Sequence, residues 1–149
     1  MSDTTTSMRY PLGEVTRGHH VAISVADLDA MVAWYEEKLG AVVTGVWNPG
    51  DLGAQVRIVT VNGFSFELVR VEGSRKSARQ WGDPPGQASV NGPFHMAFTV
   101  DDCAASAAEL KRRGVRFSWD VTDYPELKMR CAHFFDLEGN TLELVELLD

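Results

Sequence analysis

Residues 19–40 read HHVAISVADLDAMVAWYEEKLG, and this stretch decides how the rest of the chain is interpreted. Over residues 20–25, small or polar side chains alternate with bulky apolar ones, which predicts a strand with two different faces. One face carries His20, Ala22 and Ser24, and the other carries Val21, Ile23 and Val25. Asp27 is a good N-cap residue, so residues 28–39 are predicted to form a helix that ends at Gly40.

The pattern returns 75 residues later (95 minus 20) as HMAFTVDDCAASAAELKRRG, residues 95–114. His95 opens a predicted strand over 95–100, and Asp102 caps a predicted helix over 103–113 that ends at Gly114. Three more strands are predicted in each half, at 41–47, 55–61 and 64–71 and then at 115–119, 129–135 and 141–147. We therefore predict an α+β fold built from two tandem βαβββ modules.

The repeat also predicts the domain organisation. We expect a flexible tail over 1–17 and a single domain over 18–149, in which modules at 18–71 and 94–149 are joined by the loop 72–93. This loop is rich in Gly, Pro and Ser, and it is longer than a compact domain normally carries without a use. It is either a solvated linker or a cover over a pocket, with Arg75, Arg79 and Trp81 as its most interactive side chains.

Composition argues against several classes of partner. The formal net charge of −7 argues against nucleic acid or an anionic membrane. No apolar run approaches the roughly 18 residues that span a membrane, and the first ten residues lack the apolar segment of a secretory signal. Cys103 and Cys131 are too few for a disulfide framework or a thiolate metal site. We therefore expect a cytoplasmic protein whose partner is a small molecule.

Each module places one His at the start of its first strand and one Glu inside its last strand. These residues are His20 and Glu67, then His95 and Glu143. If the helices cover the apolar faces, the opposite faces can curve into a shared half-barrel trough in which the four side chains converge. Inward-facing carboxylates without a cation would be costly, and two imidazoles with two carboxylates suit a borderline divalent ion. We predict one divalent metal ion per site, drawn from Zn, Ni, Co, Mn and Fe(II).

The repeat, the segments HHVAISVADLDAMVAWYEEKLG and HMAFTVDD, and the closing FFDLEGNTLELVE resemble the vicinal oxygen chelate superfamily. This superfamily includes glyoxalase I, methylmalonyl-CoA epimerase, extradiol dioxygenases and the fosfomycin and bleomycin resistance proteins. The resemblance covers residues 18–148. It implies paired modules around a metal, usually in a homodimer, with the family's four ligand positions at His20, Glu67, His95 and Glu143. Leu137 stands where many members have Pro in an Asp-Pro-x-Gly turn.

For function, the resemblance implies a metal-dependent isomerase, lyase or epimerase that transfers a proton next to a carbonyl, with Glu67 or Glu143 as the base. An Fe(II) extradiol-type dioxygenase is the alternative, with His133 and Tyr124 as acid–base groups, although a ligand at Glu67 argues against it. Otherwise His133 is expected to pack or hydrogen-bond within its strand. A non-enzymatic protein that sequesters a ligand is the third alternative. Open sheet edges and four Trp residues favour a homodimer.

Overall fold

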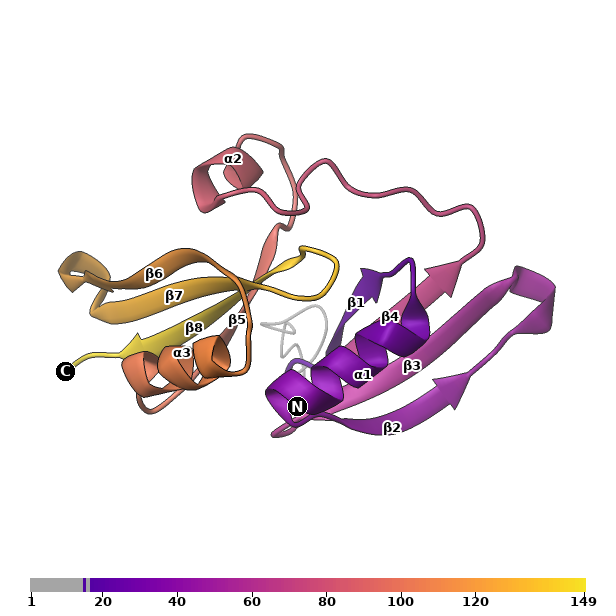
Figure 1. The fold of residues 1–149 in the computed structure, drawn as a ribbon, viewed down its shortest axis with the longest axis horizontal. Coiled ribbons are helices and arrows are strands. Elements are labelled where there is room, and N and C mark those ends of the chain that lie inside the picture. Colours follow the sequence, from indigo (N-terminus) through magenta and orange to yellow (C-terminus); the bar gives the residue numbers. More distant parts are fainter. Residues whose placement is uncertain (1–14, 16) are drawn as a thin grey trace, which may run out of the picture.

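The computed structural model describes residue 15 and residues 17–149, and these form two four-stranded sheets, each covered by one long helix (Figure 1). The strand order is β1-β4-β3-β2 in the first sheet and β5-β8-β7-β6 in the second. The pairs β1–β4 and β5–β8 are parallel, and the other two pairs of each sheet are antiparallel. The same topology in both halves confirms the two predicted βαβββ modules.

The first module follows the pattern of its sequence closely. Its elements are β1 (His20–Ser24), α1 (Leu28–Leu39), β2 (Val42–Trp47), a 3₁₀ turn (Gly50–Leu52), β3 (Ala54–Val61) and β4 (Phe64–Val71). The Asp27 side chain accepts a hydrogen bond from the backbone N–H of Ala30, and Gly40 ends the helix at φ 68°. Asn62 and Gly63 both have positive φ, as a two-residue hairpin turn between twisted strands requires.

The second module contains β5 (His95–Thr99), α3 (Cys103–Arg112), β6 (Phe117–Tyr124), a 3₁₀ turn (Pro125–Leu127), β7 (Met129–Phe135) and β8 (Thr141–Leu147). Its helix is capped by Asp102, as predicted. The strand predicted at 115–119 is wrong at both ends. Its polar continuation, residues 120–124, pairs with β7 through two register shifts, and such bulges accommodate residues that a regular strand disfavours.

The helices lie on the apolar faces of the sheets, as expected from the alternation in β1 and β5. Helix α1 packs on β3 and β4, and α3 packs on β6, β7 and β8. One core connects the modules: the Phe66 ring lies 4.9 Å from Tyr35 in α1 and 5.7 Å from Phe98 in the second module, measured between centroids. Burying each large apolar side chain contributes about 1.5–3 kcal/mol, so this shared core holds the two modules side by side (Figure 1).

The segment between β4 and β5 contains a short helix that the sequence prediction did not include. Helix α2 (Pro84–Ala88) has Pro at its first position, and the Asp83 side chain accepts a hydrogen bond from the backbone N–H of Gly86 at 2.7 Å. The Arg79 guanidinium donates hydrogen bonds to the carbonyls of Val90, Asn91 and Pro93. This arginine therefore ties the two ends of the turn around α2 together.

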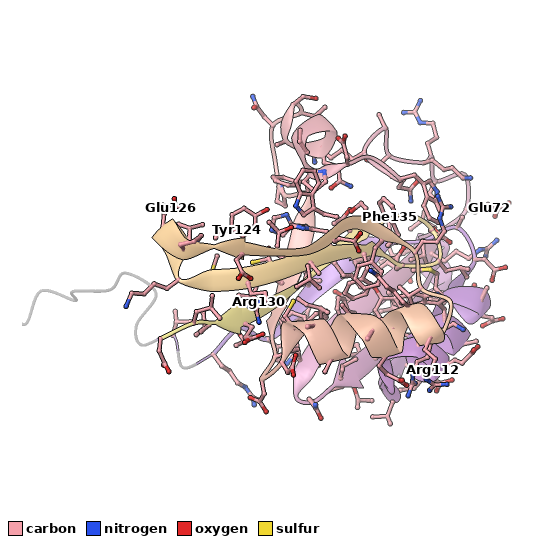
Figure 2. The ribbon with its side chains drawn as sticks, turned by 60° about the vertical axis from the view of Figure 1, so that its left-hand side comes forward. Glu72, Arg112, Tyr124, Glu126, Arg130 and Phe135 are labelled. Atoms are coloured by element: carbon pink, nitrogen blue, oxygen red, sulfur yellow. The ribbon has the colours of Figure 1, made fainter. Side chains whose placement is uncertain are left out.

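Trp81 attaches the same segment to the second module. Its indole lies 5.1 Å from the Phe135 ring, which Figure 2 labels in β7, and the Arg116 guanidinium lies 4.6 Å from the indole centroid. The Trp81 backbone N–H also donates to the carbonyl of Gly139 at 2.9 Å. Within the described part of the chain, no helix is both long and apolar enough to cross a membrane.

Candidate metal centre

The parallel pairing of β1 with β4 positions the first predicted pair. His20 lies opposite Ser65, and Glu67 lies opposite Ala22, so the imidazole and the carboxylate are diagonal neighbours on one face of the sheet. The distance from His20 Nε2 to Glu67 Oε2 is 3.1 Å. Both side chains are partly open to solvent, with 37% of His20 and 25% of Glu67 exposed.

The second module repeats this geometry. His95 lies opposite Thr141 and Glu143 lies opposite Ala97, because β5 and β8 are parallel. His95 Nε2 is 3.1 Å from Glu143 Oε2, and the two side chains are 30% and 12% exposed. The second pair therefore has the same arrangement as the first and is less exposed to solvent.

The four predicted side chains lie as two separate pairs in the single chain. Among the described residues, the one group of three metal-binding side chains with ligand atoms within 4.8 Å of one another is His95, His133 and Glu143. His20 and Glu67 lie outside this group. The role of the four residues as metal ligands stays a prediction.

His133, which the sequence predicted as an acid–base group only in the dioxygenase alternative, is the third member of this group. It lies directly opposite Glu143 in the antiparallel pairing of β7 with β8, and its Nε2 is 3.5 Å from Glu143 Oε1. Its ring also packs against His95 at 5.4 Å between centroids. Tyr124, the other group assigned to the dioxygenase alternative, pairs with Met129 at the end of the β6–β7 hairpin, beside Glu126 (Figure 2). Tyr124 and His133 therefore lie at different places on the second sheet.

The environment of this group determines its protonation. Burial lowers the pKa of His133 from its ordinary 6.5, an effect that the Glu143 carboxylate opposes, so the imidazole is neutral at pH 7. Burial and the neighbouring Glu143 raise the pKa of Cys131 to about 12, which leaves a neutral thiol on the same face. Neutral imidazoles beside a carboxylate are the donor type that Zn and related divalent ions bind in proteins.

The spacing of these donors fits a metal ion. Two donors that each lie about 2.0–2.2 Å from a tetrahedral or octahedral ion are about 2.8–3.6 Å apart. The separations of 3.1 Å for His20–Glu67, 3.1 Å for His95–Glu143 and 3.5 Å for His133–Glu143 all fall within this range. The residues present therefore fit a divalent cation by both chemistry and distance.

A cavity of about 310 Å³ lies between the two modules and includes His95 in its lining. Its walls come from β1, from the loop after β7 and from the segment that carries α2, so this segment covers a pocket, which was one of its two predicted roles. Arg75, Lys76 and Arg79 contribute cationic side chains to the rim. The lining also includes the Glu138 carboxylate, so three cations and one anion give a positive formal charge next to His95, a candidate metal ligand, in a chain whose net charge is −7.

Two similar four-stranded sheets, each with one long helix on one face and a His–Glu pair on the other, form a glyoxalase-like fold. The sequence matches the Glyoxalase/Bleomycin resistance protein/Dioxygenase superfamily over residues 17–144, and the chain belongs to this family. The family assignment agrees with the resemblance stated from the sequence.

Curated relatives include an ethylmalonyl-CoA/methylmalonyl-CoA epimerase of Cereibacter sphaeroides, 34% identical over 68% of this chain and 74% of the relative. A mitochondrial methylmalonyl-CoA epimerase of Mus musculus is 27% identical over 71% of this chain, and the match spans 58% of the mouse enzyme. Among solved structures, a glyoxalase family protein of Enterococcus faecalis superposes with a TM-score of 0.72 at 23% identity, covering 88% of this chain and 98% of that protein. The similarity to this solved structure shows the fold alone.

Proposed function

We propose that this protein is a divalent-metal-dependent enzyme that transfers a proton at the carbon next to a carbonyl, in an epimerase type of reaction. The observation that carries the proposal is the repeated His–Glu pair, with 3.1 Å between imidazole and carboxylate in both modules. The epimerase relatives support the same reaction class.

Each side chain has a role in this proposal. His20, Glu67, His95 and Glu143 would hold the ion, which would supply a Lewis acid for the carbonyl oxygen of the substrate. Glu67 or Glu143 accepts the proton when the C–H bond breaks, and the electron pair of that bond moves toward the carbonyl oxygen. The reaction ends when a proton returns to the carbon on its opposite face. No oxidant or reductant is required, because the electron pair returns to the same carbon.

We infer further that the substrate is a 2-substituted acyl thioester of coenzyme A. The relative at 34% identity is named for two such thioesters. Coenzyme A carries several phosphate groups, and the cationic rim of the cavity beside His95, with Arg75 and Lys76, suits them. The acyl end would then lie toward His95, which is part of the cavity lining.

The test is hydrogen exchange in deuterated water. With metal-loaded protein, 2-methyl-acyl-CoA thioesters should gain deuterium at the carbon beside the carbonyl. Glu67→Gln and Glu143→Gln should retain metal, and at least one should lose about 10²–10⁴-fold in turnover, because an amide cannot accept the proton. Glu126→Gln, in an exposed turn, is the matched control and should keep full activity. Exchange that survives in both site variants would contradict the assignment of the base.

A second candidate function is an Fe(II) extradiol-type dioxygenase. It is supported by the group His95, His133 and Glu143, because two imidazoles and one carboxylate are the typical ligands of non-haem Fe(II) oxygenases. Oxygen consumption with a catechol and Fe(II), undiminished in Glu67→Ala, would favour this candidate over proton transfer.

A further inference from the structure

The two modules differ at one position that the repeat makes equivalent. In the first sheet, the residue directly opposite Glu67 is Ile58 of β3. In the second sheet, the residue directly opposite Glu143 is His133 of β7. The two glutamates have the same place in their sheets, so the second module carries an imidazole where the first carries an aliphatic side chain.

An ordinary packing or hydrogen-bonding role does not account for His133. The residue is 7% exposed, so its polar ring atoms need partners within the protein. Its Nδ1 is buried and has no hydrogen-bond partner among the described residues. Its Nε2 faces Glu143 Oε1 at 3.5 Å, which is long for an N–H···O hydrogen bond. The polar neighbours of the ring are thus the Glu143 carboxylate, at a distance typical of two ligands of one metal ion, and the imidazole of His95.

The second module also gives the more enclosed set of donors. The side chains of His133, Glu143 and His95 are 9%, 12% and 30% exposed, whereas those of His20 and Glu67 are 37% and 25% exposed. A cation held among less hydrated donors interacts with them more strongly, because water screens the attraction less. The first module therefore offers two partly exposed donors, and the second offers three, of which His133 and Glu143 are largely shielded from water.

We propose that His133 is a metal ligand, so that His95, His133 and Glu143 form a three-donor set that anchors the ion within the second module. This inference rests on the proposed metal dependence and adds a residue to it. His20 and Glu67 then form the weaker, more open pair. The first module lacks a third donor because Ile58 stands at the position equivalent to His133.

The experiment measures Co(II) binding by protein first freed of metal with a chelator. Wild-type protein should bind one Co(II) per chain, followed by visible absorption and calorimetry. His133→Ile places in the second module the residue that the first module has at the equivalent position. It should weaken Co(II) binding by more than about 10-fold, because loss of a group that only supports a metal ligand already costs about 10–100-fold in affinity. Ile58→His is the reciprocal variant and should strengthen binding at the first pair.

A second measurement does not depend on how well His133→Ile folds. In Co(II)-loaded protein, each ligating imidazole gives a paramagnetically shifted N–H signal in the proton NMR spectrum. The proposed set predicts that two such signals persist in His20→Ala, from His95 and His133. If His20 is a ligand and His133 is not, the same variant should keep one.

The outcomes separate this inference from the function proposed above. Unchanged Co(II) affinity in a folded His133→Ile protein, or one shifted signal in His20→Ala, would overturn the role of His133 and leave metal binding intact. Failure of wild-type protein to bind Co(II), Zn, Ni, Mn or Fe(II) would overturn both proposals.

Discussion

The hydroxyl of Tyr35 lies 3.4 Å from Oδ2 of Asp136, which joins helix α1 of the first module to the turn after β7 in the second. Both side chains are buried, at 0% and 2% exposure. Asp136 also accepts hydrogen bonds from the backbone N–H groups of Glu138 and Asn140 and from the Asn140 side chain. A single carboxylate therefore orders the turn and connects the modules.

Burial raises the pKa of Asp136 despite these hydrogen bonds, which predicts how stability depends on pH. A carboxyl whose pKa is higher in the folded protein holds its proton more tightly there. Its favourable contribution is complete below the unfolded pKa of about 3.9 and is lost as pH rises through the folded pKa. The stability of wild-type protein relative to Asp136→Asn should therefore fall as pH rises above about 4, as measured by urea unfolding.

Asp123→Asn is the control of opposite sign. A hydrogen bond from Arg130 lowers the pKa of the exposed Asp123 carboxyl. A lowered pKa stabilises the folded protein above the unfolded pKa, and this contribution disappears as pH falls through the folded value. Wild-type protein should thus not lose stability relative to Asp123→Asn as pH rises. A parallel loss for both variants would contradict the assignment of the pH effect to Asp136.

Glu138 is a second contact between the modules. Its carboxylate accepts hydrogen bonds from the backbone N–H groups of Ala26 and Asp27, at 2.8–2.9 Å, just before helix α1. Glu138→Ala should lower the free energy of unfolding by about 1–2 kcal/mol, because two donors near a helix start lose a charged acceptor. Urea unfolding at pH 7 measures the loss. Glu126→Ala, on an exposed turn, should stay within about 0.5 kcal/mol of wild type, and equal effects would contradict the contact.

Gly139 is predicted to be essential for the position of Trp81. Its φ is +87°, and a Cβ at this residue would lie 2.5 Å from the Trp81 ring. Gly139→Ala should displace Trp81 and release the segment that it attaches, so trypsin should cut faster at Arg75, Lys76 and Arg79. Gly50→Ala meets open space at an ordinary φ, and its digestion should match that of wild type. An unchanged digestion pattern in Gly139→Ala would show that Trp81 does not hold the segment.

The predicted homodimer can be tested on edge strand β2. Four of its apolar side chains are exposed, Val42 at 59%, Val43 at 39%, Val46 at 64% and Trp47 at 58%. An apolar open edge favours pairing with another chain. Sedimentation at micromolar concentration should give twice 16.4 kDa, and Trp47→Lys should shift the equilibrium toward the single chain. Leu127→Lys, in a turn of the second module, is the control, and a wild-type monomer would contradict the prediction.

Alternation and capping made most of the fold predictable from the sequence. The faces of β1 and β5, the caps Asp27 and Asp102 and the Asn62-Gly63 turn depend on local chemistry, and the structure confirms them. The short helix α2 had a local signal as well, Asp83 followed by two prolines, but it lay in a segment without apolar periodicity. The end of β6 had no such signal, because its pairing is broken by bulges.

The candidate site was only partly predictable. The His–Glu pairs follow from the repeat, because parallel neighbours within each module put them on one face. His133 was visible in the alternation of β7, but its contact with Glu143 depends on the register between β7 and β8. The separation of His20 and Glu67 from the other three residues depends on how the modules dock. Neither register nor docking can be derived from local sequence patterns.

The strand order has a consequence for the order of events in folding. Over residues 17–149, no strand of one half pairs with a strand of the other: β1 closes its sheet on β4, and β5 closes its sheet on β8. Each sheet can therefore nucleate from its own half of the chain, where fewer residues must be ordered to close it. Contacts such as Tyr35–Asp136 form only when the halves dock. We therefore expect docking of the two halves to be the late step. Until docking is complete, an intermediate with two formed sheets would expose the apolar surface around Phe66 and Phe98 to solvent.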